Sequence, residues 1–277
     1  MNFNQSIFSN KQERRTPFLA AHRGVCGVNV PCNTLLAYKI ALDQGADIIE
    51  IDVAKSRDGQ FFVFHPGMEF AYLKTGKTIA EMSAEEVRST PILNNDEAKT
   101  HYSIPTLQEV FALLKDKVYI NVDKFWTDIK GISAEIRRAG VEKQVILKTS
   151  ADEQYFDDIE RYASDMMYMP VVQKRDNITG KLAGRNIKHI GVEVVFGDLK
   201  DDGASRGYIK SMHEKNMLVW ANSIIYDERD VLGAGFTDDV SLEKGGDYGW
   251  GKLYELGFDI IQTDWLLPAK LYFKNFN

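Results

Sequence analysis

The sequence predicts an α/β fold, a (β/α)8 TIM barrel, from three observations. Short apolar runs rich in Val, Ile and Phe recur along the chain and alternate with segments of helical periodicity, which is the pattern of βα units around a parallel sheet. Eight of these runs follow the spacing of βα units, at about 30 residues per unit. The length of 277 residues, with 44% apolar and 27% charged residues, suits one barrel of about 250 residues. We therefore expect residues 1–277 to form a single domain.

The eight expected strands are runs of β-branched and aromatic residues. They span residues 18–22, 47–53, 118–123, 145–149, 167–172, 189–196, 217–223 and 259–264. A ninth run, at residues 60–65, follows Asp58-Gly59, a dipeptide typical of tight hairpin turns. We therefore expect this run to pair with the second strand as a hairpin and not to belong to the barrel.

Helical periodicity between the strands predicts the outer layer of the barrel. The expected helices span residues 33–44, 106–115, 130–139, 152–164, 203–215 and 249–256. Two stretches interrupt the alternation. Residues 66–103 form a small insertion after the hairpin, with a short helix at 83–88. Residues 227–248 are rich in Gly and Asp, and we expect them to form a loop over the mouth of the barrel.

The charge of the chain limits its partners. A net charge of -6 and a pI near 5.5 disfavour nucleic acid, because backbone phosphates require clustered Lys and Arg. The first 16 residues are polar, without an apolar segment as long as a signal sequence or a membrane span. We expect a small-molecule partner, no stable membrane insertion and a cytoplasmic chain, or a periplasmic or secreted one if a leader has been removed. The sequence does not indicate an oligomeric partner.

The chain has two cysteines, Cys26 and Cys32. Two are too few for a disulfide framework, and they lack the paired spacing of a zinc site. A bridge within one loop is one interpretation, but the sequence favours free thiols.

Polar side chains gather at the carboxyl ends of the expected strands, where barrel enzymes place their reacting groups. These residues are His22, Arg23, Glu50, Asp52, Asp123, Lys124, Lys148, Glu193, Trp220, Asn222 and Asp264. Because the carboxyl ends of all barrel strands face the same mouth, we expect these side chains to converge on one site.

Glu50 and Asp52 stand at positions i and i+2 of one strand, so both carboxylates lie on the same face of it. Two like charges inside a barrel repel each other and lose hydration unless a cation lies between them. A hard divalent ion, Mg2+ or Ca2+, prefers such oxygen ligands. Asp123 on the neighbouring strand is the expected third ligand, and Glu193 is a weaker candidate. The alternative is a pair of surface carboxylates, or of partners for buried arginines.

His22 and His65 each end an apolar strand. Histidine exchanges protons near neutral pH, so two histidines at one mouth suit general acid and base roles. A single histidine at a strand end is more often a hydrogen-bonded structural residue. The carboxylates expected nearby favour the catalytic interpretation.

Seven segments carry a further signal in their order and spacing. They are Ala21-His22-Arg23-Gly24, residues 31–38, residues 45–53, Asp58-Gly59 to His65, residues 104–110, residues 219–222 and residues 260–264. Together they resemble the signature of the glycerophosphodiester phosphodiesterase family. The resemblance implies a (β/α)8 barrel that hydrolyses glycerophosphodiesters to sn-glycerol 3-phosphate and an alcohol with a divalent cation. It also implies that residues 66–103 correspond to an insertion characteristic of the family.

The resemblance implies roles for individual residues. His22 and His65 are the expected acid and base. The expected metal ligands are Glu50, Asp52 and Asp123. Arg23 and a lysine near the mouth are expected to hold the phosphate. From their places in the sequence we further expect Asn33, Lys148, Glu193 and Trp220 to contact the substrate.

Several positions depart from the family pattern. Cys32 stands where the family usually has Glu, Asp123 where it has another Glu, Phe125 where it has Lys, and Pro66 where an acid commonly follows the second histidine. These departures keep two alternatives open. One is a phosphodiesterase for a phosphoinositol or lysophospholipid headgroup, and the other is a barrel that binds a phosphodiester without cleaving it.

Lys124 follows Asp123 directly. On a regular strand two successive side chains point to opposite faces, so Lys124 should point away from Asp123. This favours Lys148 as the lysine that contacts the phosphate.

Overall fold

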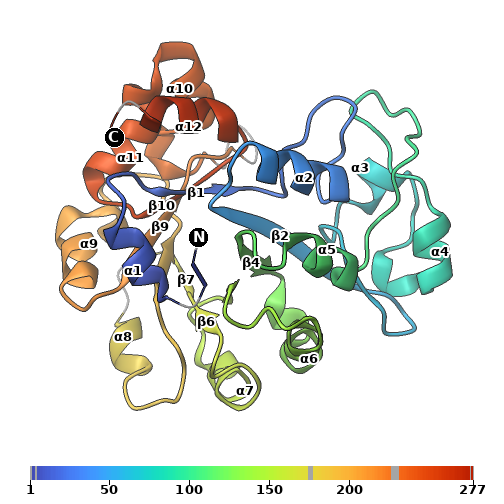
Figure 1. Ribbon diagram of the computed structural model, residues 1–277, viewed down its shortest axis with the longest axis horizontal. Helices are drawn as coiled ribbons and strands as arrows, with labels where there is room; N and C mark the ends of the chain where they lie inside the picture. The colour runs from blue at the N-terminus through green and yellow to red at the C-terminus, as the bar shows by residue number, and fades with distance from the viewer. Residues whose placement is uncertain (1, 4, 174–176, 226–230, 275, 277) are drawn as a thin grey trace.

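The computed structural model describes residues 2–3, 5–173, 177–225, 231–274 and 276. Figure 1 shows a central ring of strands surrounded by helices. The fold is a (β/α)8 barrel, as the sequence predicts.

Parallel strands form the barrel wall in the order β6-β5-β4-β2-β1-β10-β9-β8-β7. They are β1 (Phe18–Ala21), β2 (Ile48–Lys55), β4 (Tyr119–Asp123), β5 (Val145–Leu147), β6 (Met167–Tyr168), β7 (Val171–Val172), β8 (Gly191–Val194), β9 (Leu218–Asn222) and β10 (Ile260–Thr263). All eight expected strands are confirmed in position. The strand expected at 167–172 is divided into β6 and β7.

The break between β6 and β7 lies where the barrel closes. It contains Pro170, which has no backbone N–H to donate. β6 pairs with β5 and β7 pairs with β8. Single bridges from Ser150 to Val171 and from Tyr168 to His189 join the neighbouring strands on either side of the break. Since β6 and β7 belong to one continuous stretch of chain, the two ends of the strand order meet.

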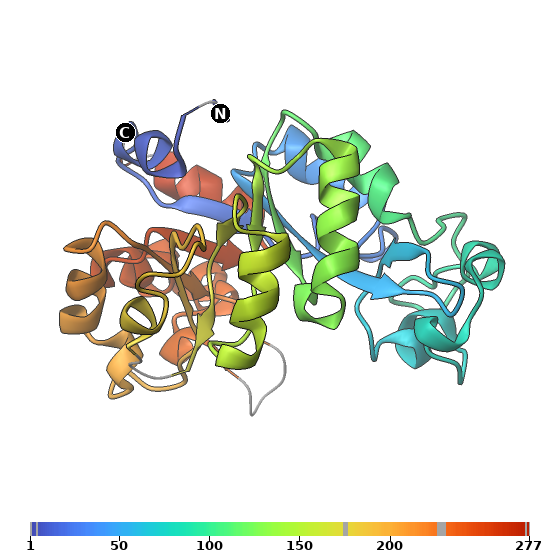
Figure 2. The same cartoon turned by 90° about the horizontal axis from the view of Figure 1, so that it is seen from below.

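A hairpin and an insertion extend from β2. β3 (Phe61–Val63) pairs antiparallel with the outer part of β2, which confirms the expected hairpin. The insertion that follows contains α3 (Glu69–Leu73), η1 (Ile79–Glu81) and α4 (Ala84–Ser89), of which α4 is the short helix expected at 83–88. It packs on a small apolar core of its own, which includes Phe62, Leu73 and Val87. Figure 2 shows this part projecting from one side of the barrel.

Helices cover the outer face of the strands (Figure 1). They are α2 (Leu35–Asp43), α5 (Leu107–Leu114), α6 (Ile129–Ala139), α7 (Phe156–Tyr162), α8 (Ile178–Lys181), α9 (Arg206–His213), α11 (Trp250–Leu256) and α12 (Leu266–Lys274), with the 3-10 turns η2 (Phe125–Thr127), η3 (Glu153–Tyr155), η4 (Asp202–Ala204), η5 (Gly233–Gly235) and η6 (Gly246–Tyr248). The six expected helices are confirmed. Several of these helices begin after a residue whose side chain accepts a hydrogen bond from an N–H of the first turn. Thr34 has this role for α2, and Thr106 has it for α5.

The prediction of a loop over the mouth at residues 227–248 was wrong for its described part. Residues 226–230 lie outside the described residues, but α10 (Asp238–Lys244) is a helix. Asp238 is buried and accepts hydrogen bonds from Ser223 and Thr263, at the ends of β9 and β10. Of the described residues between 231 and 248, none lines the cavity at the mouth. This segment therefore packs beside the end of the barrel wall.

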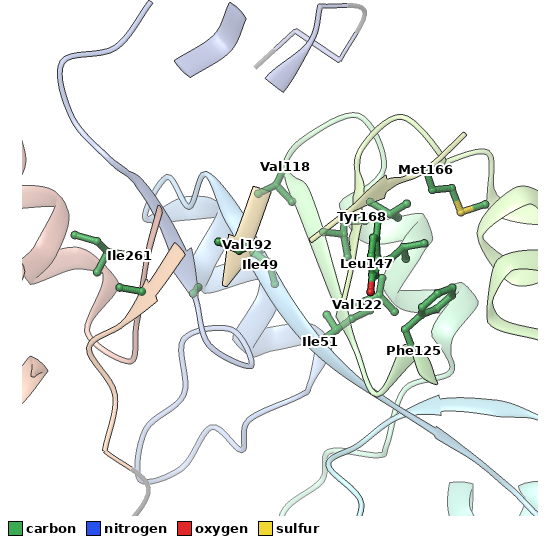
Figure 3. Close-up of a cluster of buried hydrophobic side chains, with 14 of the residues drawn as sticks. Ile49, Ile51, Val118, Val122, Phe125, Leu147, Met166, Tyr168, Val192 and Ile261 are labelled. Atoms are coloured by element: carbon green, nitrogen blue, oxygen red, sulfur yellow. The ribbon is translucent and has the colours of Figure 1, made fainter. Parts of the chain in front are cut away.

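Apolar side chains occupy both sides of the barrel wall. The larger cluster lies between strands and helices and includes Ile49, Ile51 and Val122 (Figure 3). A second cluster, with Ile48 and Tyr119, comes from the amino ends of the strands. Ile49 and Ile51 face the helices, so strand alternation turns the side chains of Glu50 and Asp52 toward the inside of the barrel. There they lie beyond the second cluster.

The N-terminal segment covers the amino end of the barrel. In α1 (Ile7–Gln12), Ile7 joins the inner apolar cluster and Asn10 donates a hydrogen bond to the Tyr119 hydroxyl at 2.6 Å. Within the ranges that the structure describes, no helix combines the length and apolar character needed to cross a membrane.

Candidate active site

Three carboxylates, the acid triad of Glu50, Asp52 and Asp123, meet at the carboxyl ends of β2 and β4. Asp123 is the last residue of β4 and lies directly opposite Asp52 in the strand register. One oxygen atom of each carboxylate lies within 4.8 Å of an oxygen of each of the other two. Glu50 and Asp52 are buried and Asp123 is half-buried. The structure thus brings together the three acids that the sequence singles out.

The charges of the acid triad oppose one another. Burial, followed by the charges of Asp52 and Asp123, raises the pKa of Glu50 well above its usual value. Burial also raises the pKa of Asp123, but the charge and hydrogen bond of Lys124 outweigh it, so the net pKa shift of Asp123 is downward. Oxygen atoms at this spacing suit a hard divalent cation, which relieves repulsion between carboxylates.

The loop between β1 and α2 supplies two predicted site residues, Arg23 and Asn33. Arg23 donates its backbone N–H to Glu50 Oε2 at 2.8 Å, and its Nε lies 3.1 Å from Asp52 Oδ2. Asn33 donates from Nδ2 to the same Asp52 oxygen at 2.9 Å. The Tyr38 hydroxyl donates to Asn33 Oδ1 at 2.7 Å, which keeps the NH2 of this amide toward Asp52.

His22 follows β1 and reaches across to the last strand. Its Nδ1 lies 2.8 Å from Asp264 Oδ1. Because a carboxylate only accepts, this contact places a proton on Nδ1. The backbone N–H of Asp264 donates in turn to Asp238 Oδ2 at 2.8 Å. His22 is therefore oriented by Asp264 after β10, which in turn is held by Asp238 of α10.

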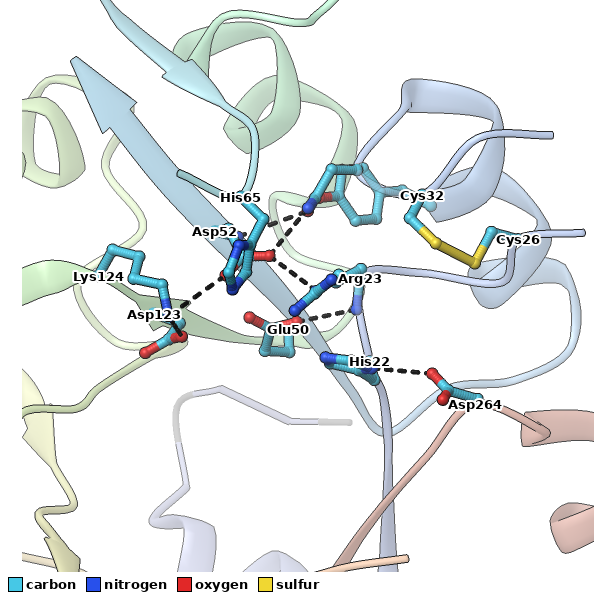
Figure 4. A network of polar contacts seen from close by, with 12 residues as sticks. His22, Arg23, Cys26, Cys32, Glu50, Asp52, His65, Asp123, Lys124 and Asp264 are labelled. Atoms are coloured by element: carbon cyan, nitrogen blue, oxygen red, sulfur yellow. Dashed lines mark hydrogen bonds and ion pairs between the residues drawn. A yellow bond between two sulfur atoms is a disulfide. The ribbon is translucent and has the colours of Figure 1, made fainter. Parts of the chain in front are cut away.

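His65 lies on the opposite side of the acid triad. Its Nε2 is 3.9 Å from Asp52 Oδ1. Burial lowers the pKa of His65; the charge of Asp52 opposes this shift, and the charges of Arg23 and Lys124 reinforce it. In Figure 4 His22 and His65 lie on either side of Glu50. Both predicted catalytic histidines therefore border the acid triad.

The prediction that Lys124 points away from Asp123 was wrong. Lys124 has a φ of 59°, so the backbone leaves the strand conformation directly after Asp123. The Lys124 ammonium donates to Asp123 Oδ2 at 2.8 Å and lies 3.9 Å from Asp52 Oδ1. Lys124 is thus the lysine beside the acid triad (Figure 4).

Lys148, the lysine that the sequence favours, lies deeper in the barrel. Its Nζ is 2.5 Å from Glu193 Oε2 and 3.2 Å from the centre of the Trp220 ring. Asn222 donates to the other Glu193 oxygen at 2.6 Å. Glu193 is therefore the partner of Lys148 and does not join the acid triad. The Trp220 side chain is fully buried.

A cavity of about 1020 Å³, the mouth cavity, is lined by the acid triad, both histidines, Arg23, Lys124, Lys148 and Glu193, whereas Asn33 and Trp220 do not line it. Its volume lies at the upper end of the range for small-molecule sites, roughly 300–1,000 Å³. Beyond the acid triad and the two histidines it extends over the loops that follow β4, β5 and β7. The lining residues there include Trp126, Ser150, Tyr155 and Gln173. The mouth cavity therefore has room for a small molecule that extends beyond the acid triad.

Cys26 and Cys32 form a disulfide, which corrects the expectation of free thiols. Their Cα atoms are 5.0 Å apart, within the range that a disulfide spans without backbone movement. The sequence spacing allowed this bridge, but the loop conformation decides it. The disulfide lies between Arg23 and Asn33 in the chain (Figure 4).

The sequence profile of the glycerophosphoryl diester phosphodiesterase family matches residues 22–222. The chain belongs to this family. The matched segment contains the acid triad and both histidines, so the residues that the structure gathers at one mouth fall inside the family region.

Curated relatives of this family member match over part of their length. A glycerophosphodiester phosphodiesterase of Caldanaerobacter subterraneus subsp. tengcongensis is 33% identical over 127 residues, which are 46% of this chain and 49% of the relative. One of Bacillus altitudinis is 30% identical over 126 residues, 45% of this chain and 49% of the relative. The chain thus spans about half the length of these relatives.

Solved structures share the fold over nearly the whole chain. A glycerophosphoryl diester phosphodiesterase from Parabacteroides distasonis has a TM-score of 0.77 at 18% identity, covering 95% of this chain and 87% of that one. An Oleispira antarctica phosphodiesterase in complex with the product sn-glycerol-3-phosphate has a TM-score of 0.65 at 19% identity, covering 98% and 100%. At these identities the similarity supports the barrel fold.

Two residues at the site have roles that sequence reasoning missed. Asp264 and Lys124 both stand at the end of a strand, so their place at the mouth was expected, but their contacts with His22 and Asp123 were not. Asp238 had no signal of this kind, because it comes from a helix outside the barrel wall.

Proposed function

We propose that this family member hydrolyses glycerophosphodiesters to sn-glycerol 3-phosphate and an alcohol, with Mg2+ or Ca2+ held by Glu50, Asp52 and Asp123. The observation that supports this most strongly is the acid triad between two histidines at one end of the mouth cavity. The names of the relatives and the product bound by the Oleispira antarctica phosphodiesterase support the same class of substrate.

The acid triad fits a hard divalent cation through its chemistry. Its ligand atoms are carboxylate oxygens, and burial together with the charges of Asp52 and Asp123 raises the pKa of Glu50, which a cation among these oxygens would offset. When bound, such a cation neutralises charge on a phosphoryl oxygen and lowers the pKa of a hydroxyl that it contacts. Arg23 and Lys124 place further positive charge beside the triad, where a phosphate is held.

The two histidines then move protons in two steps. One histidine takes the proton of the neighbouring glycerol hydroxyl, whose oxygen attacks phosphorus and forms a cyclic phosphate. The bond from phosphorus to the leaving alcohol breaks, and the other histidine gives its proton to the alcohol oxygen. Water opens the cyclic phosphate with the two roles reversed, which restores both histidines. Asp264 keeps His22 Nδ1 protonated, so His22 exchanges protons at Nε2.

The test is release of sn-glycerol 3-phosphate from glycerophosphocholine and glycerophosphoinositol, with Mg2+, Ca2+ or EDTA. We expect release that requires a cation and falls at least about 10²-fold in His22→Ala, since general acid and base catalysis contributes about 10²–10⁴-fold. His101→Ala is the matched control, because His101 is exposed in the insertion and should keep full activity.

Other outcomes point to the alternative functions. Cleavage that yields a different phosphate product, or that requires a lysophospholipid, indicates another headgroup class. A chain that binds the cation and the diesters but releases no product is a binding barrel, and the proposed hydrolysis is then wrong.

A further inference from the structure

The loop between β1 and α2 carries its disulfide close to the acid triad. The cysteine loop, residues 23–33, begins at Arg23 and ends at Asn33, and contains the bond between Cys26 and Cys32. Both end residues contact the same oxygen of Asp52. Figure 4 shows the disulfide beside Arg23, on the side of the site away from Lys124.

We propose that the disulfide between Cys26 and Cys32 is a positioning element of the cation site. It holds Arg23 and Asn33 against Asp52, so reduction of the disulfide weakens binding of a divalent cation by the acid triad. This inference rests on the cation site of the proposed function and adds a dependence on the oxidation state of the chain.

The backbone at both ends of the cysteine loop is constrained. Arg23 and Asn33 have φ angles of 56° and 58°, in the left-handed region that Asn tolerates but that a residue such as Arg seldom adopts. Such conformations persist where the surrounding structure holds them in place. The Asn33 N–H donates to the Arg23 carbonyl at 3.0 Å, so the two ends lie side by side. The disulfide is the covalent part of this constraint.

The middle of the cysteine loop faces solvent. Gly27, Val28 and Asn29 are exposed. Hydrogen bonds between Gly27 and Val30, and from Asn94 to Asn29, tie this part to itself and to the insertion. Water competes for exposed hydrogen bonds, so each adds little. Without the disulfide, we therefore expect the loop to sample conformations in which Arg23 and Asn33 leave Asp52.

The cysteine loop also packs behind the second histidine. Cys32, Arg23, Asn33 and His65 line one small cavity of about 10 Å³, which is about the space of a single water molecule. Close packing transmits displacement, so a change at Cys32 reaches the residues around Asp52.

The chemical step is thiol–disulfide exchange with a dithiol reductant. Its thiolate attacks one cysteine sulfur, releases the other cysteine as a thiol and forms a mixed disulfide. The second thiol of the reductant then closes on the first, which yields two cysteine thiols and the oxidised reductant. Cys26 and Cys32 are both half-buried beside the exposed residues 27–29, so a small reductant has access.

The experiment compares Mn2+ binding by the oxidised and the reduced full-length chain, measured from the loss of the free Mn2+ signal in electron paramagnetic resonance. The reduced chain is prepared with dithiothreitol, desalted without oxygen and checked for two titratable thiols. Residues that orient metal ligands typically contribute 10–100-fold in affinity, so we expect about tenfold weaker binding after reduction. A Cys26→Ser, Cys32→Ser double variant should bind as weakly and ignore the reductant.

Each other outcome is decisive. Equal Mn2+ affinity in both forms overturns the positioning role of the disulfide. Tighter Mn2+ binding after reduction overturns it too, since a cysteine thiolate released by reduction would then be a ligand of the cation. No Mn2+ binding in either form overturns the proposed cation site and this inference with it.

Hydrogen–deuterium exchange without metal gives a second readout. Peptides that cover residues 23–33 should exchange about tenfold faster after reduction, while peptides from α6 stay unchanged. If exchange in the cysteine loop is the same in both forms, the disulfide does not constrain Arg23 and Asn33, and the proposed cause is wrong.

Discussion

At the scale of single residues, His22 depends on a contact between the first and the last strand of the barrel. Asp264 accepts the Nδ1 proton of His22 at 2.8 Å, and in the proposed reaction this carboxylate also stabilises the imidazolium that forms when Nε2 takes up a proton. This contact ties the orientation of the His22 ring to the closure of the barrel between β1 and β10.

Asp264→Asn should lower kcat for release of sn-glycerol 3-phosphate by about 10²-fold. The neutral amide neither stabilises a positive charge on His22 nor fixes its proton on Nδ1. Mn2+ affinity should stay unchanged, since Asp264 lies outside the acid triad. Steady-state kinetics and cation titration measure the two effects. Asp43→Asn, at the exposed end of α2, is the matched control. A kcat within twofold of the wild type shows that Asp264 does not orient His22.

Residues at the site were predictable where strand alternation holds. Glu50 and Asp52 face the same side because they are two residues apart in β2. Lys124 was not predictable, because its left-handed φ of 59° breaks the alternation without a glycine or asparagine to mark the turn. The disulfide was not predictable either, since the distance between Cys26 and Cys32 depends on how the loop folds back.

At the scale of elements, the strands were predictable because each is a compact apolar run between turns. α10 was hidden by the Gly-rich segments around it, although its own signals are present. Thr237 stands at the N-cap, Asp238 and Asp239 fill the first turn, Lys244 is in the last turn and Gly245 follows, as in many helices. The break at Pro170 had a signal too, since a proline donates no N–H to a strand pair.

α10 matters because its first residue connects three elements. Asp238 Oδ1 accepts hydrogen bonds from Ser223, Trp250 and Thr263 at 2.6–2.7 Å, and Oδ2 accepts from the Asp264 N–H. Burial nevertheless raises the pKa of Asp238 to about 6, since it outweighs these hydrogen bonds. The helix thus holds a carboxyl group that titrates next to the residue that orients His22.

The raised pKa of Asp238 predicts a pH dependence of folding. An acid with a raised pKa in the folded state binds a proton more tightly there, so its contribution to stability is present at low pH and is lost as pH rises. A shift from 3.8 to about 6 corresponds to about 3 kcal/mol lost across this window. Urea denaturation at pH 4–7 should show this loss in the wild type relative to Asp238→Asn. Parallel pH profiles for the two proteins contradict the shift.

At the scale of the whole molecule, the inside of the barrel has an apolar interior at one end and a polar interior at the other. The amino ends of the strands enclose apolar side chains such as Phe18, Ile48 and Tyr119, and the carboxyl ends enclose the acid triad. The apolar part stabilises the barrel by removing surface from water. The polar part opposes stability at neutral pH, because its carboxylates lose hydration on burial and also repel one another. Sites that are tuned for function often have this cost.

This separation predicts opposite effects of one substitution on stability and on cation binding. In Glu50→Gln the amide oxygen still accepts a hydrogen bond from the Arg23 N–H. The carboxyl group whose pKa is raised well above its usual value is absent. Without cations at pH 7, the variant should therefore be more stable to urea than the wild type. Mg2+ or Ca2+ at 100 times its dissociation constant should stabilise the wild type by about 2.7 kcal/mol and the variant much less. If the variant without cations is less stable than the wild type, the Glu50 charge gains more from the positive charge of Arg23 than it loses to burial and to repulsion by Asp52 and Asp123, and the balance between the two interiors is the reverse of the one proposed.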